Sequence, residues 1–248
     1  MSVNKLFKYI RRPLKHPLFK TLYLKPVILA DSKGSYLQSE IVTQYEREIK
    51  WYFKKGASIK EARIFLQQNI QSIIQEFGDL SLYVWLGTCN LTSKSIKGRI
   101  AITTFNRNQV IESILQEVEL IIELFNKYPK SKLTFLETPL YSIVEWNRNK
   151  RHPDITEFYE QDIELEEQLV QLNKQIKLIN NRVGSYSPKF SSDLACNTKY
   201  KKGLCHNKLT KRHHHNFNLY KDGIHPKKLL AVTWLKKITE QILKDCWH

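Results

Sequence analysis

The sequence predicts a single α/β domain built as a three-layer αβα sandwich around a doubly wound parallel sheet. Two observations favour this fold class. Short apolar segments typical of buried strands alternate with longer segments of helical periodicity, and 248 residues are enough to bury a sizeable core. Alternation of strands and helices produces parallel strands joined by helical crossovers, which cover both faces of the sheet.

The strands are expected where short apolar runs end in polar residues or glycine. The predicted strands are PVILA (26–30), IKWYF (49–53), LSLYVWL (80–86) and KLTFLE (132–137). Continuous apolar runs of this length suit strands that are buried on both faces. A weaker candidate strand lies near 183–190.

Helices are expected wherever apolar residues recur at helical spacing. The predicted ranges are about 35–45, 58–77, 108–127, 157–180 and 227–244. Ser58 and Glu61 have the spacing of a capping box at the start of the second range, and Pro129 stops the third. The segments 87–106, 138–153 and 191–224 lack this periodicity and are expected to be loops.

The net charge of +16 is concentrated in two segments. Residues 1–25 and 194–221 each contain seven Lys or Arg and no acid, so the rest of the chain is almost neutral. We therefore expect a basic N-terminal arm (1–25) and a domain (26–248) with a basic loop insertion at about 191–224. Such segments attract nucleic acid or an anionic membrane surface. The alternatives are a solvated surface and an arm whose apolar residues pack on the domain.

The cysteine pattern and the N-terminus indicate a reduced, intracellular protein, cytoplasmic or nuclear. Four cysteines are too few for a disulfide scaffold, and the N-terminal segment lacks the apolar core of a signal peptide. No apolar run approaches the length of a membrane span. Cys196, Cys205, His206 and His213–His215 suggest zinc, but their spacing does not fit a zinc site, so we expect no metal.

Polar and glycine residues follow the first three predicted strands and precede the last helix. Ser32 follows the first strand, Gly56 the second and Asn90 the third, while Asp222 and His225 come just before the helix at 227. Ligands of open α/β sheets bind outside the carboxyl ends of the strands. We therefore expect these five residues to gather at one edge of the sheet, although a serine after a strand can also simply cap a helix.

Taken in this order, the five residues resemble the SGNH (GDSL-type) serine hydrolase superfamily over about residues 25–245. That family has a Gly-Asp-Ser motif after the first strand, a glycine after the second, an asparagine after the third, and Asp-x-x-His before the last helix. FLETP (135–139) and QLNKQIKLINN (171–181) are also similar to the family. The sequence departs from it in having Ala30 before Asp31, Leu91 after the asparagine, and three residues rather than two from Gly87 to Asn90.

The resemblance implies a flavodoxin-like αβα fold and a serine esterase without a cofactor. Ser32 would be the nucleophile, His225 its base and Asp222 the residue that orients the imidazole. The resemblance also implies an oxyanion hole, formed by the backbone N–H groups of Ser32 and Gly56 and the side-chain amide of Asn90. The expected substrate is a small ester or an acylated polymer. The main alternative is a non-catalytic protein on the same fold that binds nucleic acid or a glycan.

Overall fold

The computed structural model describes residues 3–15, 21–201 and 209–247. Its centre is a four-stranded, fully parallel sheet in the order β2-β1-β3-β6. The strands are β1 (Lys25–Ala30), β2 (Lys50–Phe53), β3 (Leu80–Trp85) and β6 (Lys132–Phe135). The four predicted strands are therefore confirmed, and the strand order reverses between β1 and β3.

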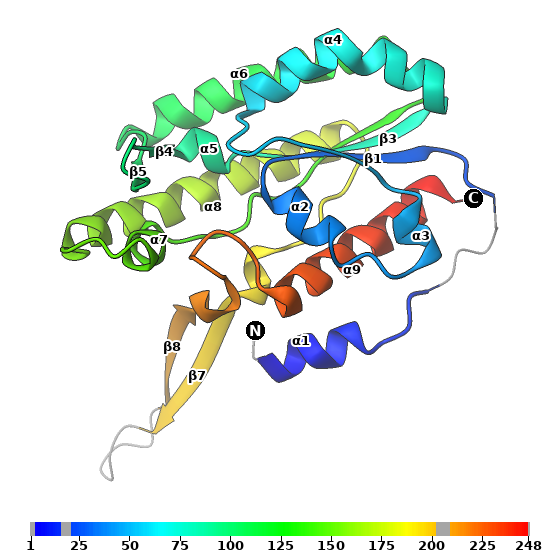
Figure 1. Ribbon diagram of the computed structural model, residues 1–248. Coiled ribbons are helices and arrows are strands. Elements are labelled where there is room, and N and C mark those ends of the chain that lie inside the picture. Colours follow the sequence, from blue (N-terminus) through cyan, green and yellow to red (C-terminus); the bar gives the residue numbers. More distant parts are fainter. Residues whose placement is uncertain (1–2, 16–20, 202–208, 248) are drawn as a thin grey trace.

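Helices cover both faces of this sheet, as the sequence predicts (Figure 1). On one side lie α4 (Ile59–Phe77), α6 (Arg107–Phe125) and α8 (Tyr159–Arg182). On the other side lie α2 (Lys33–Gln38), α3 (Gln44–Arg47) and α9 (Lys228–Cys246). The three-layer αβα class is thus confirmed. None of the helices described is long and apolar enough to cross a lipid bilayer.

Several segments that were predicted as loops contain short regular elements. The first, 87–106, holds α5 (Thr88–Leu91) and the hairpin of β4 (Thr92–Lys94) and β5 (Ile100–Ile102). The second contains α7 (Ile143–Asn149), and the basic segment contains β7 (Ala195–Lys201) and β8 (Leu209–His215). The elements α5, α7, β4 and β5 are too short to leave a periodic signal, and the longer strands β7 and β8 do not alternate apolar with polar residues. Conversely, no strand forms at 183–190, and the range 35–45 holds two helices rather than one.

The first three strands end level with one another, and this fixes where the polar residues fall. Ala30, the last residue of β1, pairs with Phe53 at the end of β2 and with Trp85 at the end of β3. Gly34 lets α2 approach this point closely, because a Cβ atom there would lie 2.9 Å from the Cβ of Ala30. The segments after all three strands therefore begin at the same edge of the sheet.

An aromatic cluster holds α9 on the sheet beside this edge. The rings of Trp85 and Trp234 meet edge-on with their centroids 5.8 Å apart, and Phe190 packs against both. Lys237 adds an ion pair with the buried Asp193 at 2.6 Å. The middle of α9 is therefore held by contacts with residues far away in the sequence.

The N-terminal segment packs on the domain through α1 (Val3–Ile10). Leu6 of this helix is fully buried, while Val3 on the same helix is 38% exposed. The ammonium group of Lys236 in α9 donates to the backbone carbonyls of Tyr9 and Ile10, which lie at the C-terminal end of α1. A cation there satisfies carbonyls that lack helical partners and complements the helix dipole.

A buried ion pair links the turn after β1 to the turn after β3. The ammonium group of Lys33 pairs with the Asp31 carboxylate and donates a hydrogen bond of 2.7 Å to Thr88 Oγ1. Both charged side chains are only 2% exposed. The same cation lies 5.6 Å from the ring centroid of Trp85. Buried charges are tolerated only when they are paired and hydrogen-bonded, and both conditions are met here.

We predict that Leu6→Ala destabilises the protein by about 2–3 kcal/mol, because it leaves a cavity between α1 and α9. Val3→Ala on the same helix is the matched control and should cost less than about 1 kcal/mol. Urea denaturation of the two variants measures both values. If Leu6→Ala and the wild type had equal free energies of unfolding, α1 would not be packed on α9 in solution.

We predict that Lys33→Met costs about 3–5 kcal/mol, because it leaves the Asp31 carboxylate buried without a cation. The double variant Asp31→Asn/Lys33→Met removes both charges and should recover most of that loss. Lys54→Met is the control, because Lys54 pairs with Glu61 at the surface and such pairs contribute about 1 kcal/mol or less. A loss in Lys33→Met no larger than in Lys54→Met would contradict the prediction.

Candidate active site

Ser32, His225 and Asp222 form a continuous chain of hydrogen bonds at the carboxyl edge of the sheet. Ser32 Oγ lies 2.8 Å from His225 Nε2, and His225 Nδ1 lies 2.7 Å from Asp222 Oδ2. The serine and the histidine are separated by 193 positions in the sequence. The fold thus joins residues from the turn after β1 and from the loop before α9.

The serine side chain is directed toward the histidine and not toward its own helix. Ser32 stands at the N-cap position of α2, but its side chain makes no capping hydrogen bond. Serine at an N-cap normally accepts from a backbone N–H in the first turn. The helix-cap alternative for Ser32 is therefore wrong, and its hydroxyl is available to His225.

The loop that carries Asp222 and His225 is rigidly built. Asp222 Oδ1 accepts the backbone N–H groups of Ile224 and His225, at 3.1 and 2.9 Å. Gly223 has a φ of 92°, and a Cβ atom there would lie 2.8 Å from the backbone nitrogen of Trp146. Glycine is required at this position, because the loop touches the first turn of α7.

Hydrogen bonding keeps the Asp222 carboxylate ionised. Burial acts to raise the pKa of Asp222, but the hydrogen bonds from the ring and backbone of His225 lower it below the usual value for an aspartate. A lowered folded-state pKa means that this group stabilises the fold above its unfolded-state pKa. That contribution disappears as the pH falls through the folded-state pKa.

Two aromatic side chains flank the His225 ring. Tyr36 of α2 stacks on it with centroids 4.9 Å apart, and Trp146 of α7 lies at 5.9 Å with a tilt of 54°. Because the His225 ring packs against both Tyr36 and Trp146, its orientation is restricted more than by the Asp222 hydrogen bond alone. Neither aromatic residue was identified from the sequence, because tyrosine and tryptophan in polar stretches give no positional signal.

Asn90 is held in one orientation by the start of α4. Its Oδ1 accepts the backbone N–H of Ile59 at 3.0 Å, which turns its Nδ2 away from that helix. Gly87, where the turn into α5 begins, has a φ of 119°, and a Cβ atom there would lie only 2.5 Å from Thr138 Oγ1. The sharp turn explains how Asn90 reaches this edge despite the additional residue between it and Gly87.

Three hydrogen-bond donors at this edge have no partner within the described part of the chain. They are the backbone N–H groups of Ser32 and Gly56 and the Nδ2 group of Asn90. Gly56 lies in the exposed turn after β2, and this turn is tied to β1 by a bond from Lys54 N to the Ala30 carbonyl. The five residues singled out in the sequence therefore surround the ends of β1, β2 and β3.

The Cys89 thiol near this edge is not a competing nucleophile, and the described side chains form no metal site. Burial, reinforced by the charge of Asp31, raises the pKa of the Cys89 thiol to about 11, so it remains protonated and a poor nucleophile at neutral pH. Within the described ranges, no three His, Cys, Asp or Glu side chains are grouped as a metal site would require. Of the zinc alternative, Cys205, His206 and the side chains of His213 and His214 lie outside the part of the chain that the structure describes.

Comparison with known proteins identifies the fold. No protein-family profile and no curated protein matches the chain. Among solved structures, it is similar to a GDSL-like lipase from Bacteroides thetaiotaomicron, with 13% identity, a TM-score of 0.56 and coverage of 89% of this chain and 88% of that one. It is also similar to a lipase/acylhydrolase from Enterococcus faecalis (10% identity, TM-score 0.51, coverage 90% and 97%).

An acetyl xylan esterase is a further structural neighbour, with 11% identity, a TM-score of 0.51 and coverage of 86% of this chain and 97% of that one. Identities this low establish a common fold and leave the chemistry to the residues of the site. The three matches cover 86% to 90% of this chain, and the first of them is named for the GDSL motif that the turn after β1 resembles. The chain therefore has the fold of the SGNH (GDSL-type) hydrolases.

Proposed function

We propose that the protein is a serine esterase that hydrolyses a carboxylic ester through an acyl-enzyme. The observation that carries the proposal is the bonded chain from Ser32 Oγ through His225 to Asp222, with distances of 2.8 and 2.7 Å. A serine hydroxyl becomes an effective nucleophile when an adjacent base removes its proton. No cofactor is needed for this chemistry.

The proposed reaction begins with attack by Ser32 Oγ on the ester carbonyl, while its proton passes to His225 Nε2. The tetrahedral intermediate then collapses, and His225 returns that proton to the oxygen of the leaving alcohol. Water attacks the remaining acyl-enzyme in the same manner and releases the carboxylic acid and the free serine. Asp222, held ionised, stabilises the imidazolium formed in both steps.

The three unpartnered donors provide a reason for the site to favour the intermediate. Negative charge develops on the former carbonyl oxygen during attack, and the N–H groups of Ser32, Gly56 and Asn90 are proposed to donate to it. Preorganised donors stabilise this charge without further reorganisation. The expected substrate is a small ester or an acylated polymer.

The competing proposal is a non-catalytic protein on the same fold that binds nucleic acid or a glycan through its basic segments. The N-terminal segment offers partial support, since Lys5 and Lys8 are exposed on α1 and Arg11 is exposed just after it. Binding of this kind would weaken steeply with salt. It would not require the Ser32 hydroxyl to face an imidazole, and this observation favours the esterase.

We predict that a fluorophosphonate probe modifies Ser32 and that Ser32→Ala abolishes both labelling and hydrolysis of 4-nitrophenyl acetate. The reason is that only a serine activated by a base reacts rapidly with such probes. Peptide mapping of the labelled protein locates the adduct. Ser39→Ala, an exposed serine at the end of α2, is the control and should retain both activities.

Persistence of labelling in Ser32→Ala would refute the assignment of the nucleophile. Absence of both labelling and hydrolysis in the wild type, together with salt-sensitive binding of an oligonucleotide, would favour the non-catalytic alternative.

We predict that Asn90→Asp lowers kcat about 100-fold with little change in KM, because it replaces a donor to the oxyanion with an acceptor. Asn90→Asp retains an oxygen that can accept the Ile59 N–H, whereas Asn90→Ala loses that bond too. Comparable kcat losses in both variants would indicate the oxyanion role. A loss confined to Asn90→Ala, or one seen entirely in KM, would assign Asn90 to structure or to substrate binding instead.

A further inference from the structure

Two lysines lie over the tryptophan that flanks His225. Lys94, the last residue of β4, has its ammonium nitrogen 5.7 Å from the ring centroid of Trp146. Lys150, which follows α7, has its ammonium nitrogen 5.3 Å from the same centroid. Cations at this distance from an indole are attracted to its face. One aromatic side chain, only 7% exposed, thus brings two positive charges beside the candidate base.

Neither lysine is neutralised by a neighbouring acid within the described part of the chain. Glu145, the acid of α7, is engaged by Arg148. Glu157 is shared by Arg99 and His152, at 3.6 and 3.3 Å. Both lysine side chains are exposed, so their charges are available to a ligand.

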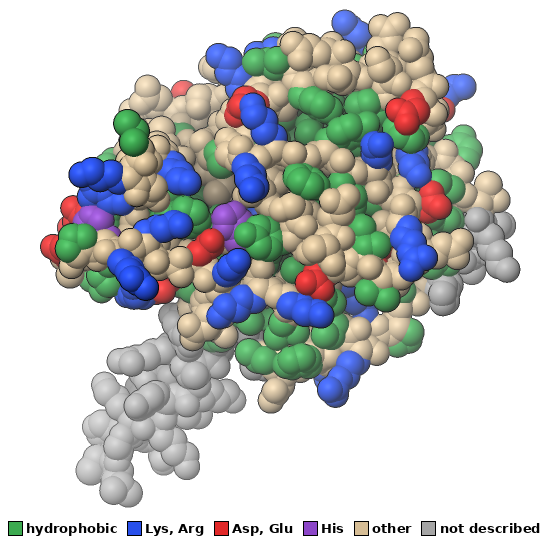
Figure 2. All heavy atoms as spheres, viewed as in Figure 1, with side chains coloured by type: hydrophobic (Ala, Val, Ile, Leu, Met, Phe, Trp, Pro, Cys, Tyr) green, Lys and Arg blue, Asp and Glu red, His purple; other side chains and the backbone are tan. Residues whose placement is uncertain are grey.

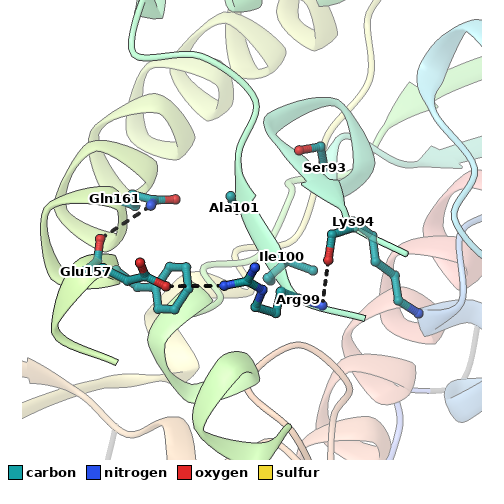
Figure 3. A pocket seen from close by; sticks show the side chains of 9 residues that line it. Ser93, Lys94, Arg99, Ile100, Ala101, Glu157 and Gln161 are labelled. Carbon is teal, nitrogen blue, oxygen red and sulfur yellow. Dashed lines mark hydrogen bonds and ion pairs between the residues drawn. The ribbon is translucent and has the colours of Figure 1, made fainter. Parts of the chain in front are cut away.

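Lys94 and Arg99 both belong to the β4–β5 hairpin and both line a cavity beside it, but their side chains extend in different directions. A cavity of about 370 Å³ lies between this hairpin and the start of α8. Figure 3 shows Arg99 reaching toward Glu157 in that cavity, while the Lys94 side chain extends in the opposite direction, away from Glu157. Figure 2 shows Lys and Arg side chains spread over this face of the molecule, including the side where β4, β5 and α7 lie.

The position beside His225 determines which part of an ester these charges would meet. In the proposed reaction His225 gives its proton to the leaving alcohol, so the alcohol lies against this residue and its neighbours. Of the proposed oxyanion donors, Gly56 lies in the turn after β2, and Asn90 lies in α5, the short helix that directly precedes β4. Because Trp146 contacts His225, we expect the leaving group to extend toward Trp146 and the two ammonium groups that lie over its ring.

We propose that Lys94 and Lys150 bind an anionic group, a carboxylate or a phosphate, on the alcohol portion of the substrate. The preferred substrates are then acyl esters of a hydroxy acid, a sugar acid or a phosphorylated alcohol. This inference rests on the proposed esterase function and adds the class of its leaving group. The ammonium groups act by binding the anion and take no part in bond making.

The test compares pairs of esters that differ in charge on one side of the carbonyl. For the alcohol side, the pair is 4-acetoxybenzoate and its neutral methyl ester, with 4-acetoxyphenyl phosphate to separate phosphate from carboxylate. For the acyl side, the pair is 4-nitrophenyl hemisuccinate and 4-nitrophenyl butanoate. The quantity measured is the ratio of kcat/KM for the charged ester to that for its neutral partner.

For the alcohol-side pair, we expect Lys94→Glu and Lys150→Glu each to lower this ratio by about 3- to 10-fold, and the double variant to lower it further. Added sodium chloride should lower the ratio in the wild type and have less effect in the double variant. Lys130→Glu is the matched control, because Lys130 is exposed just before β6, at the opposite edge of the sheet, and should leave the ratio unchanged.

An unchanged ratio in the double variant would overturn the inference. A change seen only with the hemisuccinate pair would also overturn it, because the charges would then serve the acyl side. Ser32-dependent hydrolysis of the neutral methyl ester establishes the proposed function separately from either result. If the wild type hydrolyses none of these esters, the proposed function fails and the inference fails with it.

Discussion

The site depends on one geometric constraint, namely that β1 lies between two parallel neighbours whose ends are level with its own. Ala30 pairs with both Phe53 and Trp85, so the three chain segments leave the sheet together. Each segment then contributes one candidate group: the hydroxyl of Ser32, the backbone N–H of Gly56, or the amide of Asn90. A shift of one residue in either neighbouring strand would carry its group to a different height and face.

The buried charge of Lys33 ties two of these segments together. Leu91, which is fully buried, stands where the SGNH pattern has an aspartate, and its side chain has no carboxylate to bond the turn after β1. The link runs instead from Asp31 through Lys33 to Thr88, the first residue of α5. Because that short helix also carries Asn90, the ion pair holds the turn that contains Ser32 against one of the proposed oxyanion donors.

The sequence predicted the strands and long helices well because their apolar periodicity is strong and unbroken. The five residues of the candidate site were singled out because, taken in order at strand ends and before the last helix, they resemble the SGNH pattern; the position of each residue alone is a weak signal. Short elements such as the β4–β5 hairpin escaped, since three-residue strands leave no periodic signal. The roles of Trp146 and Lys33 were not predicted for another reason. Their roles depend on contacts with His225 and Thr88, which the chain supplies from distant positions.

The fold and the chemistry rest on different kinds of observation. The GDSL-like lipase, the lipase/acylhydrolase and the acetyl xylan esterase are 13% or less identical to this chain. Their similarity therefore supports the fold and does not establish the activity. The case for catalysis comes from what the site leaves unpaired. A serine that only capped α2 would direct its hydroxyl to that helix. An Asn90 with a purely structural role would use its Nδ2 group as well as its Oδ1 in hydrogen bonds within the protein. Ser32 instead bonds His225, and the Nδ2 of Asn90 remains unbonded among the described residues. In the proposed reaction, these unpaired donors would be satisfied by the charged oxygen of the intermediate.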